Sequence, residues 1–178
     1  DYVFDGEGEK PFEVTDKPKP INYYGHTKYE GELAVQSTLQ KYFIVRISWV
    51  FGINGNNFVK TMLKLGKERD EISVVADQIG SPTYTYDLAK LLVEMIKTDR
   101  YGIYHATNEG YCSWYEFTCE IFKQAGINIK VNPINTEDYP TKSKRPKNSR
   151  LNKDSLNGFI KLPKWEEAVN KFLKFNSL

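Results

Sequence analysis

Pro20-Ile-Asn-Tyr-Tyr-Gly-His-Thr-Lys28-Tyr-Glu-Gly31-Glu32 opens the segment that decides the fold of this 178-residue chain. Asn22 is a good helix N-cap, because its side chain can accept a hydrogen bond from the first turn. The pattern predicts a helix that runs to about Lys41, with Leu33 and Leu39 facing inward.

Apolar runs flank this helix. Phe43-Ile-Val-Arg-Ile-Ser-Trp-Val50 is rich in β-branched and aromatic residues and is typical of a buried parallel strand, and Tyr2–Phe4 resembles the end of another. Strand, helix and strand in this order predict a right-handed crossover in a doubly wound parallel sheet. The fold class is therefore α/β.

The rest of the chain continues this alternation of strands and helices. Gly52–Asn57 is a turn, Ser113 can cap a helix that Gly126 ends, and Pro163 suits the first turn of a last helix. The predicted helices are 58–67, 87–97, 113–124 and 163–175, and the predicted strands are 72–75, 102–106 and 129–131.

Tyr24 and Lys28 are the candidate catalytic pair. Residues four apart on a helix share a face, and an ammonium near a phenol favours the phenolate and lowers the tyrosine pKa. Such a tyrosine can act as a general acid near neutral pH. The pattern is short, so a surface tyrosine lying over a lysine stem is the competing interpretation; Tyr86 and Lys90 form a second copy that we take as incidental.

Composition excludes several functional classes. The net charge is +2, and the basic residues between Lys142 and Arg150 lack interleaved aromatic side chains, so a nucleic-acid partner is not expected. No apolar run reaches membrane-spanning length, and we expect no membrane partner.

The two cysteines, Cys112 and Cys119, are expected to pack in a predicted helix. So small a number of cysteines indicates a reducing, cytoplasmic location. The chain has only two histidines, so no metal site is expected; His105 is interpreted as a locally hydrogen-bonded residue at a strand end.

A series of motifs carries a family resemblance. Pro20-x3-Tyr24-Gly25-x2-Lys28-x2-Gly31-Glu32 is followed by Arg46-x-Ser48-Trp49-Val-Phe-Gly52, by Asp77-Gln-x-Gly80-Ser-Pro-Thr83, and by Arg145-Pro-x2-Ser149-Arg-Leu151. This series resembles the extended short-chain dehydrogenase/reductases and, within them, the dTDP-4-dehydrorhamnose reductases. The resemblance covers essentially all of the chain.

The resemblance implies a function and a cofactor. It implies reduction of the 4-keto group of dTDP-4-dehydro-6-deoxy-L-mannose to dTDP-L-rhamnose with NADPH or NADH. Tyr24 would donate the proton, and Lys28 would hold the nicotinamide ribose and lower the pKa of Tyr24. The family's Ser or Thr would stand just before Asp1, and its Gly-rich cofactor turn would also lie upstream. We therefore expect a C-terminal portion that by itself neither binds NADPH well nor turns over.

The resemblance also implies the substrate-binding residues. Asp1 and Tyr2 would approach the sugar, Trp49 would border the sugar or nucleotide, and Arg145 and Arg150 would clamp the diphosphate. Each assignment has an alternative that remains open. Tyr2 could simply pack in a strand, Trp49 could be a core residue, and the basic loop with Arg145 and Arg150 could simply be solvated. Gly80–Thr83 is either a substrate-side loop or a simple turn.

The expected architecture has two parts. Residues 1–50 would form the C-terminal part of a Rossmann-like dinucleotide-binding domain, and residues 51–178 mainly a smaller α/β substrate domain, with an approximate, discontinuous boundary. A homodimer is compatible with the family. Alternatives are another extended-family epimerase or dehydratase, or a non-catalytic relative such as the regulatory subunit of methionine adenosyltransferase, since fold alone does not fix function.

Overall fold

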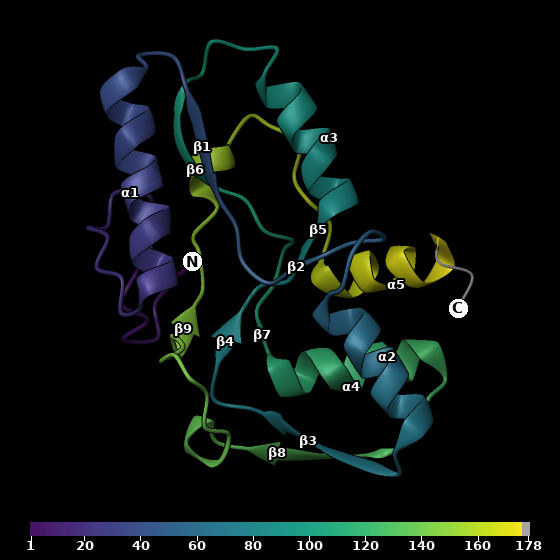
Figure 1. Ribbon diagram of the computed structural model, residues 1–178. Helices are drawn as coiled ribbons and strands as arrows, with labels where there is room; N and C mark the ends of the chain where they lie inside the picture. Colours follow the sequence, from purple (N-terminus) through teal and green to yellow (C-terminus); the bar gives the residue numbers. More distant parts are fainter. Residues whose placement is uncertain (176–178) are drawn as a thin grey trace.

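Short parallel strand pairs and the helices beside them form the framework of the molecule, which a computed structural model describes for residues 1–175 (Figure 1). The helices are α1 (Tyr23–Thr38), α2 (Phe58–Glu68), α3 (Thr85–Met95), α4 (Trp114–Ala125) and α5 (Trp165–Phe175), with 3₁₀ turns η1 (Thr136–Asp138) and η2 (Asp154–Leu156). The strands are β1 (Phe43–Arg46), β2 (Val50–Phe51), β3 (Glu71–Val75), β4 (Ile79–Gly80), β5 (Thr83–Tyr84), β6 (Gly102–His105), β7 (Cys112–Ser113), β8 (Lys130–Ile134) and β9 (Asn148–Ser149). The α/β class predicted from the sequence is confirmed.

The strand pair β1–β6 carries the first lobe. The two strands run parallel, from Phe43 opposite Gly102 to Arg46 opposite His105. Helices α1 and α3 lie on opposite sides of this pair (Figure 1). One hydrophobic cluster, which includes Leu91 of α3, fills the space between α3 and the strands.

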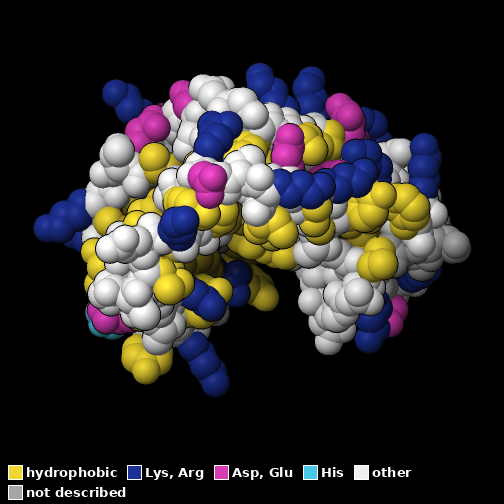
Figure 2. All heavy atoms as spheres, turned by 90° about the horizontal axis from the view of Figure 1, so that it is seen from above, with side chains coloured by type: hydrophobic (Ala, Val, Ile, Leu, Met, Phe, Trp, Pro, Cys, Tyr) yellow, Lys and Arg dark blue, Asp and Glu magenta, His cyan; other side chains and the backbone are white. Residues whose placement is uncertain are grey.

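The second lobe contains α2, α4 and α5, the parallel pair β3–β8, and a sheet in which β4 pairs with β9 in parallel and with β7 in antiparallel. Its larger hydrophobic cluster is centred on aromatic side chains such as Phe51, Phe117 and Phe172. The predicted ends of α4 are confirmed: Ser113 and Glu116 form a capping box, and Gly126 has the left-handed φ of 67°. Seen from above, the molecule has a notch whose edge carries hydrophobic side chains (Figure 2).

Three sequence predictions about the first lobe are wrong. Tyr2–Phe4 forms a turn, closed by a hydrogen bond from the Phe4 N–H to the Asp1 carbonyl, rather than a strand. Helix α1 ends at Thr38 instead of about Lys41. Leu33 and Leu39 are 40% and 51% exposed, because the side of α1 that meets the described structure carries Gly25 and Glu32.

The predicted strand Phe43–Val50 is two strands. Trp49 has a φ of 47°, a left-handed conformation that is uncommon for a residue other than glycine. The chain therefore turns between β1 and β2 and changes partner, from β6 to β5. This break places Trp49 at the junction of the lobes.

Two further features bear on the expectations above. Cys112 lies in β7 rather than in a helix, and both cysteines are free thiols. No helix within residues 1–175 is long and apolar enough to cross a bilayer.

Candidate active site

Tyr24 and Lys28 lie on the same face at the start of α1. The Lys28 Nζ is 5.3 Å from the centroid of the Tyr24 ring, and 57% of Tyr24 is exposed. The Tyr2 ring meets the Tyr24 ring edge to face, with centroids 5.4 Å apart. Gly25 permits this approach, since a Cβ atom there would overlap the Tyr2 carbonyl oxygen.

A cavity of about 340 Å³ opens beside Tyr24. Three of the expected substrate-binding residues share its wall with Tyr24: Asp1, Tyr2 and Trp49. The Oδ2 atom of Asp1 is buried and has no hydrogen-bond partner within residues 1–175. Burial raises the pKa of the Tyr2 phenol above its usual range, and the positive charge of Arg145 opposes that effect. The structure thus brings together residues that the sequence separates by more than twenty positions.

The Gly80–Thr83 segment braces Trp49 in its left-handed conformation. The Ser48 hydroxyl donates to the Ser81 carbonyl at 2.6 Å, and the Thr83 hydroxyl donates to the Ser48 carbonyl at 2.6 Å. At Gly80, a Cβ atom would lie 2.8 Å from the Trp49 ring, so only glycine lets the ring approach this closely. The segment therefore holds the turn that presents Trp49.

Trp49 also stacks on Trp114. Their ring centroids are 3.7 Å apart and the planes differ by 14°. Phe58 packs on Trp114, with ring centroids 4.5 Å apart. The result is an aromatic wall that extends from the Tyr24 cavity into the second lobe.

A second cavity, of about 550 Å³, shares Gln78 and Trp114 with the first and is its neighbour. Its floor is apolar, whereas Arg69 and Arg145 bring positive charge to its wall. Together the two cavities form a cleft that runs from Tyr24 to Arg145. We call this the Tyr24–Arg145 cleft.

Arg150 is placed differently from Arg145. Its Nη1 donates to the Asn148 Oδ1 at 3.1 Å, and it lines neither cavity of the cleft. The structure therefore does not bring the two arginines together as a pair.

Several residues of the cleft were missed by sequence reasoning. Gln78 stands inside the quoted Asp77–Thr83 motif, and its position could have been suspected from that motif. Trp114 follows a helix cap and reads as a core residue, and Phe58 and Arg69 belong to an ordinary amphipathic helix and its end. Only the folded chain brings Phe58 and Arg69 to the cavity wall that Trp114 also lines.

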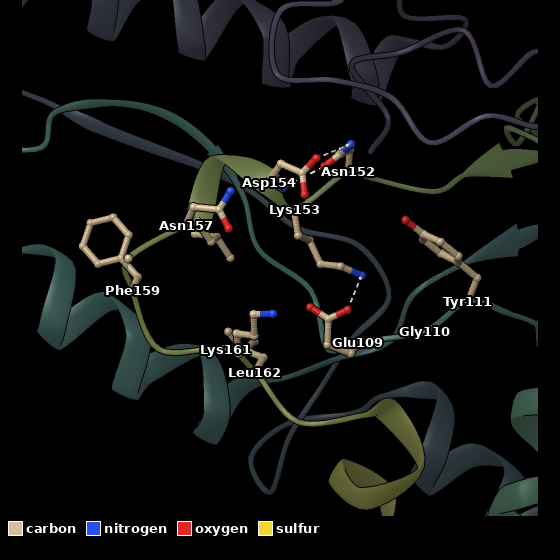
Figure 3. Close-up of a pocket in the computed structure, with 12 residues that line it drawn as sticks. Glu109, Gly110, Tyr111, Asn152, Lys153, Asp154, Asn157, Phe159, Lys161 and Leu162 are labelled. Carbon is tan, nitrogen blue, oxygen red and sulfur yellow. Dashed lines mark hydrogen bonds and ion pairs between the residues drawn. The ribbon is translucent and has the colours of Figure 1, made fainter.

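A third cavity, of about 470 Å³, lies away from Tyr24 (Figure 3). Lys153 points at Glu109, with Nζ 3.5 Å from the carboxylate, and lies over the Tyr111 ring. Burial lowers the pKa of Lys153, although Glu109 acts in the opposite sense. Since Lys153 and Glu109 neutralise each other in this cavity, we assign the cavity no catalytic role.

No group of three or more His, Cys, Asp or Glu side chains in the described chain could hold a metal ion. The chemistry available in the cleft is that of phenols, the Asp1 carboxylate, aromatic faces and guanidinium groups, with the Lys28 ammonium beside Tyr24.

Comparison with known proteins identifies the family. The family described as "RmlD substrate binding domain" matches residues 1–177. The chain belongs to this family. Among its relatives, dTDP-4-dehydrorhamnose reductase of Escherichia coli K12 is 42% identical over 186 residues, and the match covers 97% of this chain and 62% of the relative. The spore coat polysaccharide biosynthesis protein SpsK of Bacillus subtilis is 41% identical, with coverage of 99% and 62%.

Solved structures agree with the family assignment. The dTDP-4-dehydrorhamnose reductase of Bacillus anthracis, in complex with NADP, has a TM-score of 0.95 and 49% identity, covering 98% of this chain and 63% of that one. The dTDP-glucose 4,6-dehydratase of the same organism, in complex with NAD, has a TM-score of 0.80 at 13% identity, which shows the fold alone. The Rossmann-type architecture predicted from the sequence is confirmed. The chain spans less than two thirds of the length of these RmlD relatives.

Proposed function

We propose that the protein is an NAD(P)H-dependent ketoreductase that converts dTDP-4-dehydro-6-deoxy-L-mannose to dTDP-L-rhamnose. The observation that carries this proposal is the cleft: the Tyr24 and Lys28 pair stands at one end, and an aromatic wall leads to arginines at the other. The relatives named dTDP-4-dehydrorhamnose reductase support the same activity.

Tyr24 acts as the proton donor. Reduction of a ketone places negative charge on its oxygen, and a phenol at hydrogen-bond distance can neutralise that charge by giving up its proton. The Lys28 ammonium, 5.3 Å from the ring, stabilises the charge that then develops on the phenol oxygen. Both groups are exposed at the start of α1, so a substrate in the cavity can reach the hydroxyl.

The cofactor, NADPH or NADH, supplies the hydride when bound. The residues at the start of α1 fit its ribose, since Lys28 has three N–H donors and is exposed beside Tyr24. In this proposal Tyr24 and Lys28 hold the ribose hydroxyls and so orient the nicotinamide toward the ketone. The NADP-bound B. anthracis relative supports NADP as one such cofactor.

The cleft accounts for recognition of the dTDP-deoxysugar. The unpaired Oδ2 of Asp1 accepts a hydrogen bond from a sugar hydroxyl, and Tyr2 and Trp49 border the ring. The apolar surface around Trp114 suits a thymine base. Arg145, whose guanidinium fork matches phosphate oxygens, binds the diphosphate. Arg150, which is turned toward Asn148, is not part of this assignment.

Three broader expectations accompany the activity. The division into a dinucleotide-binding part (residues 1–50) and a substrate part (residues 51–178) is supported by separate hydrophobic clusters, and the packing of α3 against β1 makes that boundary discontinuous. A homodimer is supported by the exposed apolar side chains of Val93 on α3 and of Ile96 at its C-cap. A cytoplasmic location is supported by the free thiols of Cys112 and Cys119.

The test is a Tyr24→Phe substitution in the intact protein, with NADPH oxidation by the keto sugar nucleotide as the assay. Loss of the proton donor should lower kcat by about 10²- to 10⁴-fold and leave KM nearly unchanged. Tyr23→Phe is the matched control, because Tyr23 is the neighbouring residue and is outside the cavity wall. Full activity in the Tyr24 variant would remove Tyr24 from the mechanism, and no oxidation by the unaltered protein would refute the reductase assignment.

A further inference from the structure

We propose that Asn22 is a positioning residue that ties the Tyr24 helix to the loop carrying Arg145, so that the sugar and the diphosphate of the substrate meet one preformed cleft. The inference rests on the proposed function and adds to it a residue that touches neither sugar nor phosphate.

Asn22 uses both halves of its side-chain amide. Its Oδ1 accepts a hydrogen bond from the Gly25 N–H at 2.8 Å and so caps α1. Its Nδ2 donates to the Lys144 carbonyl at 2.9 Å. A single side chain therefore joins the start of α1 to a residue 122 positions later in the sequence.

The loop from Tyr139 to Lys147 needs such a tether. Residues 139–145 are all exposed, so little apolar packing holds them. The far end of the loop is fastened, since the Lys147 Nζ lies 3.0 Å from the Asp77 carboxylate and Pro146 is buried. The middle has only exposed polar contacts, among them the Asn22 hydrogen bond and a long, 3.9 Å ion pair between Lys144 and Glu7. Exposed ion pairs of this kind contribute little.

The tethered residue, Lys144, directly precedes Arg145. A carbonyl fixed at position 144 restricts the backbone from which the next side chain extends. Arg145 then lines the cleft on the phosphate side, while Tyr24, two residues after Asn22, lines it on the sugar side. Movement of the loop away from α1 would separate the guanidinium from the proton donor.

An Asn22→Asp substitution separates the two roles of the side chain. Aspartate is as good an N-cap as asparagine, so α1 should remain intact. A carboxylate has no N–H, so it cannot donate to the Lys144 carbonyl. Asn22→Ser is a neutral second variant that also keeps a cap but offers no amide, and it controls for the added charge. Circular dichroism verifies that both variants fold.

Binding of dTDP and of thymidine, measured by calorimetry on the intact protein, provides the readout. Loss of one hydrogen bond that orients Arg145 should weaken dTDP binding by about 3- to 10-fold in both variants. Thymidine has no phosphate, so its affinity should stay within about twofold of the unaltered protein. In an Arg145→Gln background, Asn22→Asp should cause no further loss, because the residue it acts through has already been removed.

Each outcome is decisive. Unchanged dTDP affinity in both variants, equal losses for dTDP and thymidine, or additive losses in the Arg145→Gln background would overturn the inference while leaving the proposed function intact. Failure of the unaltered protein to bind dTDP would instead overturn the proposed function, and this inference with it.

Discussion

His105 should make the stability of the protein depend on pH below 6.5. Its side chain is 0% exposed at the end of β6. The Nδ1 atom lies 3.1 Å from the Asn152 carbonyl, and Nε2 lies 3.4 Å from the Arg46 Nη1. Because Arg46 can only donate, Nε2 must accept and Nδ1 must carry the proton. The buried ring is therefore neutral.

The size of this pH dependence follows from the shift in the pKa of His105. Burial and, next, the charge of Arg46 lower the His105 pKa from 6.5 to about 3. This shift corresponds to about 5 kcal/mol between the two protonation states. Below pH 6.5 His105 binds a proton in the unfolded chain but stays neutral in the folded chain. The free energy of unfolding therefore falls as the pH falls. The limiting slope is about 1.4 kcal/mol per pH unit, and the stability contributed by the neutral ring is fully present above pH 6.5 and lost progressively toward pH 3.

Denaturant unfolding at several pH values between 6.5 and 5 measures this slope. In a His105→Gln variant, residue 105 cannot titrate, and the slope should decrease by about the amount given above. The absolute stability of that variant is not the readout, since the substitution also alters buried contacts. His26→Gln is the matched control, because it makes the same change at the chain's other histidine, which is exposed on α1. Identical slopes in the His105 variant and the unaltered protein would refute the reasoning.

Two further predictions concern the residues that hold the cleft together. Arg46→Met should lower the free energy of unfolding by about 3–5 kcal/mol, because it leaves the Glu32 carboxylate buried without its partner. Adding Glu32→Leu to the Arg46→Met variant should restore much of the lost stability, measured by thermal unfolding. An Arg46→Met variant as stable as the unaltered protein would contradict this account. Gly80→Ala should cost about 1–3 kcal/mol by forcing the Trp49 ring to move, and tryptophan fluorescence should change with it. An unchanged fluorescence spectrum and melting temperature would show that a methyl group at position 80 fits beside the Trp49 ring, against this prediction.

Local chemistry in the sequence predicted the helices of the second lobe well. Ser113 and Gly126 bound α4 as expected, since a side-chain cap and a left-handed glycine act within one turn of the helix. The apolar stripe of α5, which includes Trp165 and Val169, is buried as its spacing predicted. These features depend on neighbours in sequence, so the sequence alone carries them.

Long-range contacts account for the failures. The Phe43–Val50 run has the composition of one strand, but Ser81 and Thr83 hold the chain in a turn at Trp49, and they come from a loop more than thirty residues later. The apolar character of Leu33 predicted an inward position, whereas the described structure meets α1 through the charged side chain of Glu32. Patterns of hydrophobicity do not reveal a buried ion pair.

The candidate site was predicted in part for the same reason. Tyr24 and Lys28 are one helical turn apart, so their relative placement follows from helix geometry. The position of Arg145, which lines the cleft, depends on how its loop is tethered, whereas Arg150 follows β9 and bonds to Asn148. Trp114 enters the site only by stacking on Trp49.

The way α1 is fastened explains why polar contacts matter for the position of Tyr24, the proposed proton donor. Within the described structure, α1 buries Gly25 and Glu32 and little apolar surface. The Glu32 carboxylate receives two hydrogen bonds from Arg46, at 2.8 and 2.7 Å, which tie the helix to β1. A buried ion pair adds little net stability compared with apolar packing, but its geometry is specific, whereas an apolar contact tolerates sliding and rotation. With Asn22 before Tyr24 and Glu32 after it, the helix that carries this hydroxyl is held by directional contacts on both sides. We infer that these contacts set the register of the helix, and hence the position of the Tyr24 phenol in the cleft.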